Sequence, residues 1–197
     1  AQNFWSPTVQ ITPDSTEAMN PAFGDSWLFR FNPQSEWLVF IQAVRGASDI
    51  VALRTNVGGV NWLPIPYAIT TDTVRDDNPS LAQSYSFNAG YPRMVVWERG
   101  RNDIYYSSGL DTVWSPPAPL GSGDFGGTNP CVSVGDSGFG AVWENGGRIL
   151  FSEYRNDIWS APTFINSDAD TVNFNPHMKY YDGRPIAVWE RRKRGSR

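Results

Sequence analysis

The chain has 197 residues and a net charge of −4, and this charge argues against general binding to nucleic acid. Aromatic residues make up 14% of it, and 18 glycines and 15 prolines supply turn positions, so the composition favours strands and tight turns over helices. No stretch approaches the roughly 18 apolar residues that a membrane-spanning helix needs. The single cysteine, Cys131, excludes an internal disulfide.

One phrase recurs along the chain, and each copy follows an Asn-Pro pair. The apolar run ending in Trp-Glu appears at residues 94–98, 141–144 and 186–190, with a looser copy at 37–42. The four pairs begin at Asn20, Asn78, Asn129 and Asn175, so their spacings are 58, 51 and 46 residues (78−20, 129−78, 175−129). Periods of this length built from short β-type runs are typical of propeller blades, because one blade cannot bury both of its faces alone.

Each repeat predicts a four-stranded antiparallel blade. The first strand begins at the Asn-Pro pair, as in residues 130–134, and the second is the apolar run ending in Trp-Glu. The third covers residues such as 104–107 or 149–152, and the fourth follows a later Trp. The second strand does not alternate between apolar and polar residues, which is typical of a strand covered on both faces. We therefore expect an all-β propeller with about four repeats.

In chain order, an opening outer strand at residues 1–11 precedes repeats at 12–65, 66–120, 121–165 and 166–197, all within a single domain or segment covering 1–197. The last repeat stops after Trp189-Glu190, because residues 191–197 are too polar for a third strand. The chain is then a fragment of a larger propeller or a small closed ring. Open terminal blades leave apolar faces and strand edges uncovered, so we expect self-association, or dependence on flanking sequence, through the first strand and the last two.

A second motif places a Trp seven residues after a hydroxyl residue. Ser follows the Trp in two of the three copies, with Pro one or two positions later. The three pairs are Thr55 and Trp62, Ser107 and Trp114, and Ser152 and Trp159. This spacing resembles the Asp-box (BNR) hairpin of sialidase-like β-propellers. The copies are degenerate, since the expected Asp is replaced by Val57, Gly109 and Tyr154. The resemblance implies a propeller in which these six residues are structural.

Active sialidases, as the resemblance implies, use three arginines on a carboxylate, a Tyr–Glu nucleophile pair and an Asp acid/base. The closest string to their Arg-Ile-Pro phrase is Arg184-Pro185-Ile186, in inverted order, and Pro92-Arg93-Met94 shows the same entry into a strand. No arginine therefore carries over, and no tyrosine is marked by a motif. With one histidine and one cysteine there is also no Cys-His or Ser-His-Asp set. We predict no catalytic residue.

Charged residues at one end of the predicted blades are candidates for ligand binding. In a propeller, the loops after the second and fourth strands surround one mouth of the channel. The candidates there are Glu98, Arg99, Arg101, Glu144, Arg148, Glu190, Arg191, Asp72, Asp124 and Asp168, with Gln42 replacing Glu in the first repeat. Such groups can hydrogen-bond sugar hydroxyls or a peptide. Alternatively, the Asp residues cap turns and each Glu pairs with a nearby Arg.

Asp168-Ala169-Asp170 has the composition of a calcium loop, but it lacks the Gly and Glu that an EF-hand loop requires. We predict no metal site and no cofactor. The chain starts Ala1-Gln2-Asn3, which fits a mature protein after signal cleavage or an excised fragment.

The sequence thus predicts a non-catalytic module, secreted or at the cell surface, whose composition suits bacterial export. It would bind a glycan or a protein, or act as a scaffold, without nucleic-acid binding or membrane insertion. Two alternatives stay open. One is a fragment of an exo-sialidase-like glycoside hydrolase whose remaining catalytic residues lie outside these 197 positions. The other is a purely structural cell-surface repeat.

Overall fold

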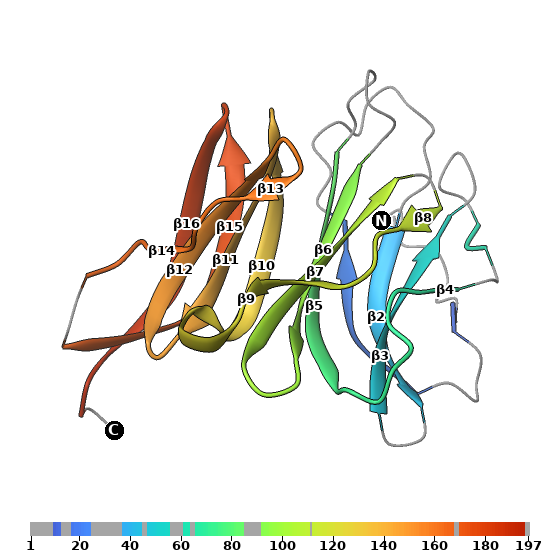
Figure 1. Ribbon diagram of the computed structural model, residues 1–197, viewed down its shortest axis with the longest axis horizontal. Coiled ribbons are helices and arrows are strands. Elements are labelled where there is room, and N and C mark those ends of the chain that lie inside the picture. The colour runs from blue at the N-terminus through green and yellow to red at the C-terminus, as the bar shows by residue number, and fades with distance from the viewer. Residues whose placement is uncertain are drawn as a thin grey trace, which may run out of the picture.

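The computed structural model describes residues 10–12, 17–24, 37–44, 47–55, 61–63, 66–84, 92–110, 112–167 and 170–195. These residues form sixteen β-strands and one short 3-10 helix, η1 (Gly123–Phe125) (Figure 1). The predicted all-β fold class is confirmed. Within the same ranges, no helix has the length and apolar character needed to cross a membrane.

The strands form four antiparallel sheets that follow one another along the chain. Sheet 1 contains β1 (Ala18–Phe23), β2 (Trp37–Val44), β3 (Ala47–Arg54) and β4 (Tyr67–Ala68). Sheet 2 contains β5 (Asp76–Gln83), β6 (Arg93–Arg99), β7 (Asp103–Leu110), β8 (Val113–Trp114) and β9 (Ala118–Gly121). Sheet 3 contains β10 (Thr128–Gly135), β11 (Gly138–Asn145), β12 (Arg148–Arg155), β13 (Ile158–Trp159) and β14 (Thr163–Phe164). Sheet 4 contains β15 (Thr171–Tyr181) and β16 (Arg184–Lys193).

The sheets stack in chain order, as Figure 1 shows from sheet 1 on the right to sheet 4 on the left. The first strands of successive sheets are neighbours, since β1 contacts β5, β5 contacts β10 and β10 contacts β15. Among the described residues, no strand pairing joins sheet 4 back to sheet 1. The predicted opening strand at residues 1–11 lies outside the described residues, except for positions 10 and 11.

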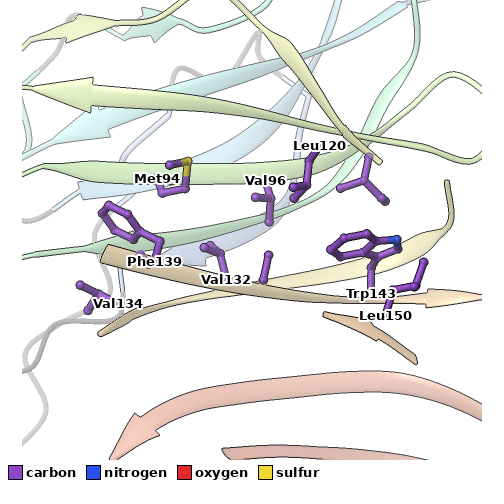
Figure 2. Close-up of a cluster of buried hydrophobic side chains, with 11 residues drawn as sticks. Met94, Val96, Leu120, Val132, Val134, Phe139, Trp143 and Leu150 are labelled. Carbon is purple, nitrogen blue, oxygen red and sulfur yellow. The ribbon is translucent and has the colours of Figure 1, made fainter. Parts of the chain in front are cut away.

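Apolar side chains of the second strands enter the spaces on both sides of their sheet. On β6, Val95 and Trp97 pack in a cluster with sheet 1, whereas Met94 and Val96 pack in a cluster with sheet 3. Figure 2 shows the second cluster, where Met94 and Val96 face Val132 and Trp143 from sheet 3, among others. This two-sided burial accounts for the continuous apolar run in the sequence.

The Asn-Pro pairs lie inside the first strands, and the prediction that those strands begin at the pair is corrected. Each pair coincides with a register shift against the second strand, for example between Asp77 and Ser80. All four Asn residues have φ between 45° and 51°. Asn tolerates this left-handed conformation because its short polar side chain bonds locally, and Pro fits a bulge because it has no N–H to donate to the ladder.

Candidate functional site: the Asn-Pro groove

The four Asn-Pro pairs come together around one open groove of about 640 Å³, which we call the Asn-Pro groove. The stacking of β1, β5, β10 and β15 places equivalent positions of the four repeats side by side. Each repeat contributes the Asn, the Pro and the residue that follows, and β16 adds Val188, Trp189 and Glu190. The following residues are Ala22, Ser80, Cys131 and His177.

The Asn side chains link neighbouring sheets through hydrogen bonds. Asn20 Nδ2 donates to Asp77 Oδ1 at 2.9 Å and to Asn78 Oδ1 at 3.3 Å. Asn78 Nδ2 donates to Glu98 Oε1 at 2.7 Å and to Asn129 Oδ1 at 3.5 Å. A contact between two Asn side-chain amides therefore crosses the interface of sheets 1 and 2, and a second one crosses the interface of sheets 2 and 3.

The three predicted Glu residues bond to these Asn residues. Glu98 Oε1 also accepts the Asn129 backbone N–H at 2.6 Å, which ties sheet 2 to sheet 3. Asn129 Nδ2 donates to Glu144 Oε2 at 3.3 Å, and Asn175 Nδ2 donates to Glu190 Oε1 at 2.8 Å. The alternative paired each Glu with a nearby Arg, whereas these hydrogen bonds join each Glu to an Asn. Each Glu lies opposite the residue that precedes the Asn, which brings its carboxylate close to the Asn amide.

The first repeat has no Glu at this position. The residue that takes its place is one position away from the residue that the sequence predicts. Met19, which precedes Asn20, lies opposite Ile41, whereas Gln42 lies opposite Ala18. The structure therefore places Ile41, rather than Gln42, at the position of the three Glu residues. Ile41 is buried between sheets 1 and 2, so the polar chain at the groove has no acceptor from β2 at this position.

Arg99 and Asp72 belong to a polar network at the interface of sheets 1 and 2. Arg99 Nη1 lies 3.1 and 3.3 Å from the two carboxylate oxygens of Asp76, and its Nη2 pairs with Asp72. Trp97 Nε1 donates to Asp76 Oδ1 at 2.8 Å. Burial raises the pKa of Asp76, whereas the Val74 N–H, and then Arg99, lower the pKa of Asp72. That N–H donates to Asp72 Oδ1 at 2.9 Å, so Asp72 caps a turn, as the alternative proposed.

Of the predicted ligand-binding candidates that the structure describes, Glu190 lines the groove and the others do not. Arg101 is exposed in the turn between β6 and β7, and Arg191 is exposed on β16. The Arg148 guanidinium lies 3.4 Å from the ring centroid of Phe164. Asp124 is exposed in η1, where its backbone oxygen accepts from Asn145 Nδ2 at 3.0 Å. Asp168 lies outside the described residues.

The six hairpin residues lie in and beside the hairpins that join the third strand of each repeat to the segment after it. Thr55 and Trp62 form a bridge, while Trp114 lies opposite Gly109 and Trp159 opposite Tyr154. Ser107 Oγ donates to the Ser115 carbonyl and Ser152 Oγ to the Ser160 carbonyl, each at 2.7 Å. These bonds connect the two strands of a hairpin, and none of the six residues lines the groove.

Sequence reasoning missed the Asn residues as site residues, although they were the clearest repeat markers. Their signal was a fourfold recurrence directly before Pro, which we interpreted as a strand start. Trp189 belongs to a second strand, which the sequence predicts to be covered on both faces, yet it lines the groove, and its Nε1 donates to Asn173 Oδ1 at 3.0 Å.

A second, more apolar pocket of about 540 Å³ continues from the groove. The two share Ser80, Cys131, His177 and Val188. The pocket is lined mostly by apolar residues of all four sheets, including Phe23, Leu81, Val132, Met178 and Ile186. The combined cavity therefore has one polar end and one apolar end.

Across the described ranges, no group of three or more His, Cys, Asp or Glu side chains is arranged to hold a metal ion. Comparison of the sequence with protein-family models and with curated proteins finds no match. The arguments for function therefore rest on the groove itself.

Proposed function

We propose that the chain is a β-propeller-type repeat module that binds a neutral, hydroxyl-rich ligand, such as an oligosaccharide, in the Asn-Pro groove and does not catalyse a reaction. The observation that carries this proposal is the convergence of four Asn-Pro pairs and Glu190 on one groove, with Glu98 and Glu144 hydrogen-bonded to the Asn side chains that line it. The propeller arrangement is supported by the stacking of sheets with their first strands side by side.

The chemistry of the groove favours a neutral ligand. Amides donate and accept hydrogen bonds and carboxylates accept them, a combination that suits hydroxyl groups, which do both. The part of the groove wall that the structure describes contains no Lys or Arg. A ligand carboxylate would therefore meet Glu190 without a cation from the described wall to offset its charge. A neutral sugar is favoured over a sialic acid for this reason.

Trp189 and the adjoining apolar pocket suit the other side of such a ligand. A pyranose ring has an apolar face that packs on aromatic and aliphatic side chains, and apolar surface removed from water contributes roughly 25 cal/mol per Å². Val188 lies in both the groove and the pocket, and its side chain is 63% exposed. Ligand binding would cover this surface.

The glycoside hydrolase alternative has one observation in its favour. Tyr180 Oη donates to Glu153 Oε1 at 2.9 Å, which brings a Tyr and a Glu together. However, Tyr180 is only 7% exposed and packs between sheets 3 and 4, away from the groove. Burial raises its pKa, and the hydrogen bond to Glu153 raises it further. A nucleophile must be within reach of the ligand, so this enclosed position favours a packing role even though Glu153 could act as a base.

The test compares two substitutions of the same chemical type. Asn129→Gly removes a groove amide yet keeps a residue that adopts φ of 51° without strain. Asn156→Gly makes the same change at φ of 52° in the exposed turn between β12 and β13. A glycan array first identifies a ligand for the wild-type protein, and calorimetric titration then gives its Kd for all three proteins.

We expect Asn129→Gly to weaken binding by about tenfold, because one or two hydrogen bonds to the ligand are lost. Asn156→Gly should leave the Kd unchanged. Equal affinity of all three proteins would place the ligand elsewhere. A blank array at high protein concentration would favour the purely structural repeat, and steady turnover of aryl glycosides would favour the hydrolase.

A further inference from the structure

The chain of Asn side-chain amides along the groove is interrupted at one of the three sheet interfaces. At the interfaces of sheets 1 and 2 and of sheets 2 and 3, one Asn donates to the Oδ1 of the next, at 3.3 and 3.5 Å. Asn129 and Asn175 hold the same places at the interface of sheets 3 and 4. Among the described residues, no hydrogen bond joins this third pair, and each Asn donates to the Glu of its own sheet instead. One N–H of Asn129 Nδ2 and the Oδ1 of Asn175 are therefore available to a ligand.

A second bond between neighbouring sheets is missing at the same interface. Glu98 of sheet 2 accepts the backbone N–H of Asn129 in sheet 3 at 2.6 Å. Glu144 is the counterpart of Glu98, because each lies opposite the residue that precedes an Asn. Within the described ranges, Glu144 accepts from Asn129 Nδ2 alone, at 3.3 Å, and has no bond to Asn175. Both absences indicate that the polar ends of sheets 3 and 4 stand further apart than those of sheets 2 and 3.

The residue that follows each Asn-Pro pair explains the wider spacing. In sheet 2 it is Ser80, whose Oγ accepts the Val132 N–H of sheet 3 at 3.1 Å. In sheet 3 it is Cys131, whose Sγ accepts the Met178 N–H of sheet 4 at 3.4 Å. The two bonds are equivalent, because Val132 and Met178 are each the third residue after an Asn. Sulfur is larger than oxygen and a weaker acceptor, so Cys131 holds the adjoining strands further apart.

We propose that the gap between Asn129 and Asn175 receives a hydroxyl group of the ligand, and that Cys131 sets the width of this gap. The hydroxyl accepts from Asn129 Nδ2 and donates to Asn175 Oδ1, so it completes the interrupted chain of amides. A hydroxyl suits this place because one atom both donates and accepts, as a bridge between an amide donor and an amide acceptor requires. This inference rests on the proposed function, which places a hydroxyl-rich ligand in the groove.

The surroundings of the gap determine how the rest of the ligand lies. Asn129 and Asn175 line the groove, whereas Cys131 and His177, two residues further along each strand, line both the groove and the apolar pocket. The carbon that carries the hydroxyl therefore lies where the two cavities meet, with its apolar face toward the pocket. Covering that face adds to affinity in proportion to the apolar area removed from water. The site thus favours a ring alcohol with a hydroxyl at its edge, as in a pyranose.

The first test uses cyclohexanol and methoxycyclohexane, which share an apolar ring but differ in whether the oxygen can donate. Binding to the wild-type chain is followed by two-dimensional NMR, with the side-chain amides of Asn129 and Asn175 as reporters. The amide of Asn156, in the exposed turn between β12 and β13, is the control for non-specific shifts. We expect the alcohol to bind about two- to tenfold more tightly, because the ether leaves Asn175 Oδ1 without a donor.

The second test exchanges sulfur and oxygen at the two equivalent contacts. Cys131→Ser should draw sheets 3 and 4 together and bring Glu144 within reach of the Asn175 N–H. We expect hydrogen exchange of that N–H to slow by about two- to tenfold, and cyclohexanol to bind more weakly by a similar factor. The reverse change, Ser80→Cys, should speed exchange of the Asn129 N–H, which Glu98 holds in the wild-type protein.

Equal binding of the alcohol and the ether would overturn the proposal, because water alone would then fill the gap. Unchanged exchange of the Asn175 N–H in folded Cys131→Ser would also overturn it, since the sulfur would not set the spacing. A blank glycan array has a different meaning. Together with selective binding of cyclohexanol at Asn129 and Asn175, it would support the hydroxyl site and reject only the oligosaccharide as its ligand.

Discussion

Val142 and Val188 hold the same place in neighbouring sheets, yet one is core and the other is surface. Val142 pairs with Cys131 and Val188 with His177, each the second residue after the Asn of an Asn-Pro pair. Val142 is completely buried because sheet 4 packs over it, whereas Val188 is 63% exposed on the far face of that sheet. Burial at this position therefore depends on whether a following sheet is present, and the local sequence does not decide it.

Trp143 and Trp189 directly follow these valines, so their side chains lie on the opposite face of the same strands. Trp143 faces sheet 2 and is completely buried, and its Nε1 donates to the Phe125 carbonyl at 2.9 Å. Trp189 faces sheet 3 and is only partly buried, although its Nε1 also has a partner. Among the described residues, sheet 4 is thus covered on one face, whereas sheets 2 and 3 are covered on both, and this difference predicts where substitutions are tolerated.

The largest effect is expected at the two tryptophans. Trp143→Ala empties a fully enclosed site and should lower the free energy of unfolding by about 3–5 kcal/mol. Trp189→Ala should cost about 1–3 kcal/mol, because solvent already reaches part of the ring. Chemical denaturation of both variants gives the comparison.

Glu144→Ala serves as a control from the same strand as Trp143. Its carboxylate holds one long hydrogen bond from Asn129, so the loss should stay below about 1.5 kcal/mol. A loss as large as that of Trp143→Ala would contradict the facing of β11 described above. Equal losses for the two Trp variants would show that sheet 4 is as well covered in solution as sheet 3.

A smaller but cleaner contrast is expected at the two valines, where the deleted atoms are identical. Val142→Ala should lower the free energy of unfolding by about 2 kcal/mol, because two buried methyl groups are removed and a cavity is left. Val188→Ala should change it by less than about 0.5 kcal/mol. Urea denaturation at several protein concentrations measures both. A concentration-dependent loss for Val188→Ala would indicate that self-association covers this face, as the sequence predicted for the terminal blades.

The sequence was sufficient for the all-β class and for the two-sided burial of the second strands. A continuous apolar run such as residues 94–97 has this simple physical cause, and the Asn-Pro spacing marks the stacked repeats. The backbone conformation at each Asn could not be predicted from the sequence in the same way. A residue with φ near 50° inside a strand is a bulge, and single-sequence patterns place Asn-Pro at turns more readily.

The partners of the candidate residues depended on stacking, which local sequence does not contain. Glu98 bonds to the Asn129 N–H, 31 residues along the chain, only because β5 and β10 are neighbours. Ile41 was missed as the counterpart of Glu98 because the first repeat lacks the Trp-Glu phrase. The sequence alignment of the first repeat was therefore wrong by one residue and gave Gln42 instead. Asp76 was missed for a related reason: its carboxylate is enclosed by Trp97 and Arg99, and only the packed interface brings these together.

The smallest expected effect concerns pH and contrasts the indole partners of sheets 2 and 4. Trp97 donates to the carboxylate of Asp76, whereas Trp189 donates to the neutral amide of Asn173 at the equivalent position. Burial raises the pKa of Asp76 above its ordinary value of 3.8, against the hydrogen bonds from Thr70 and Trp97 and the charge of Arg99. The folded protein therefore binds more protons than the unfolded chain at pH values just above 3.8.

It follows that the contribution of Asp76 to stability is present below pH 3.8 and is lost as the pH rises through the higher pKa of the folded state. Asp76→Asn gives sheet 2 the amide that sheet 4 already has, so this decline should disappear from the curve of unfolding free energy against pH. Asp72→Asn should act in the opposite direction, because the pKa of Asp72 is lowered and its stabilisation is lost as the pH falls. Urea denaturation between about pH 3 and pH 7 separates the two slopes, since this range spans the usual carboxyl titration. Slopes of the same sign in the two difference curves would mean that Arg99, rather than burial, controls the protonation of Asp76.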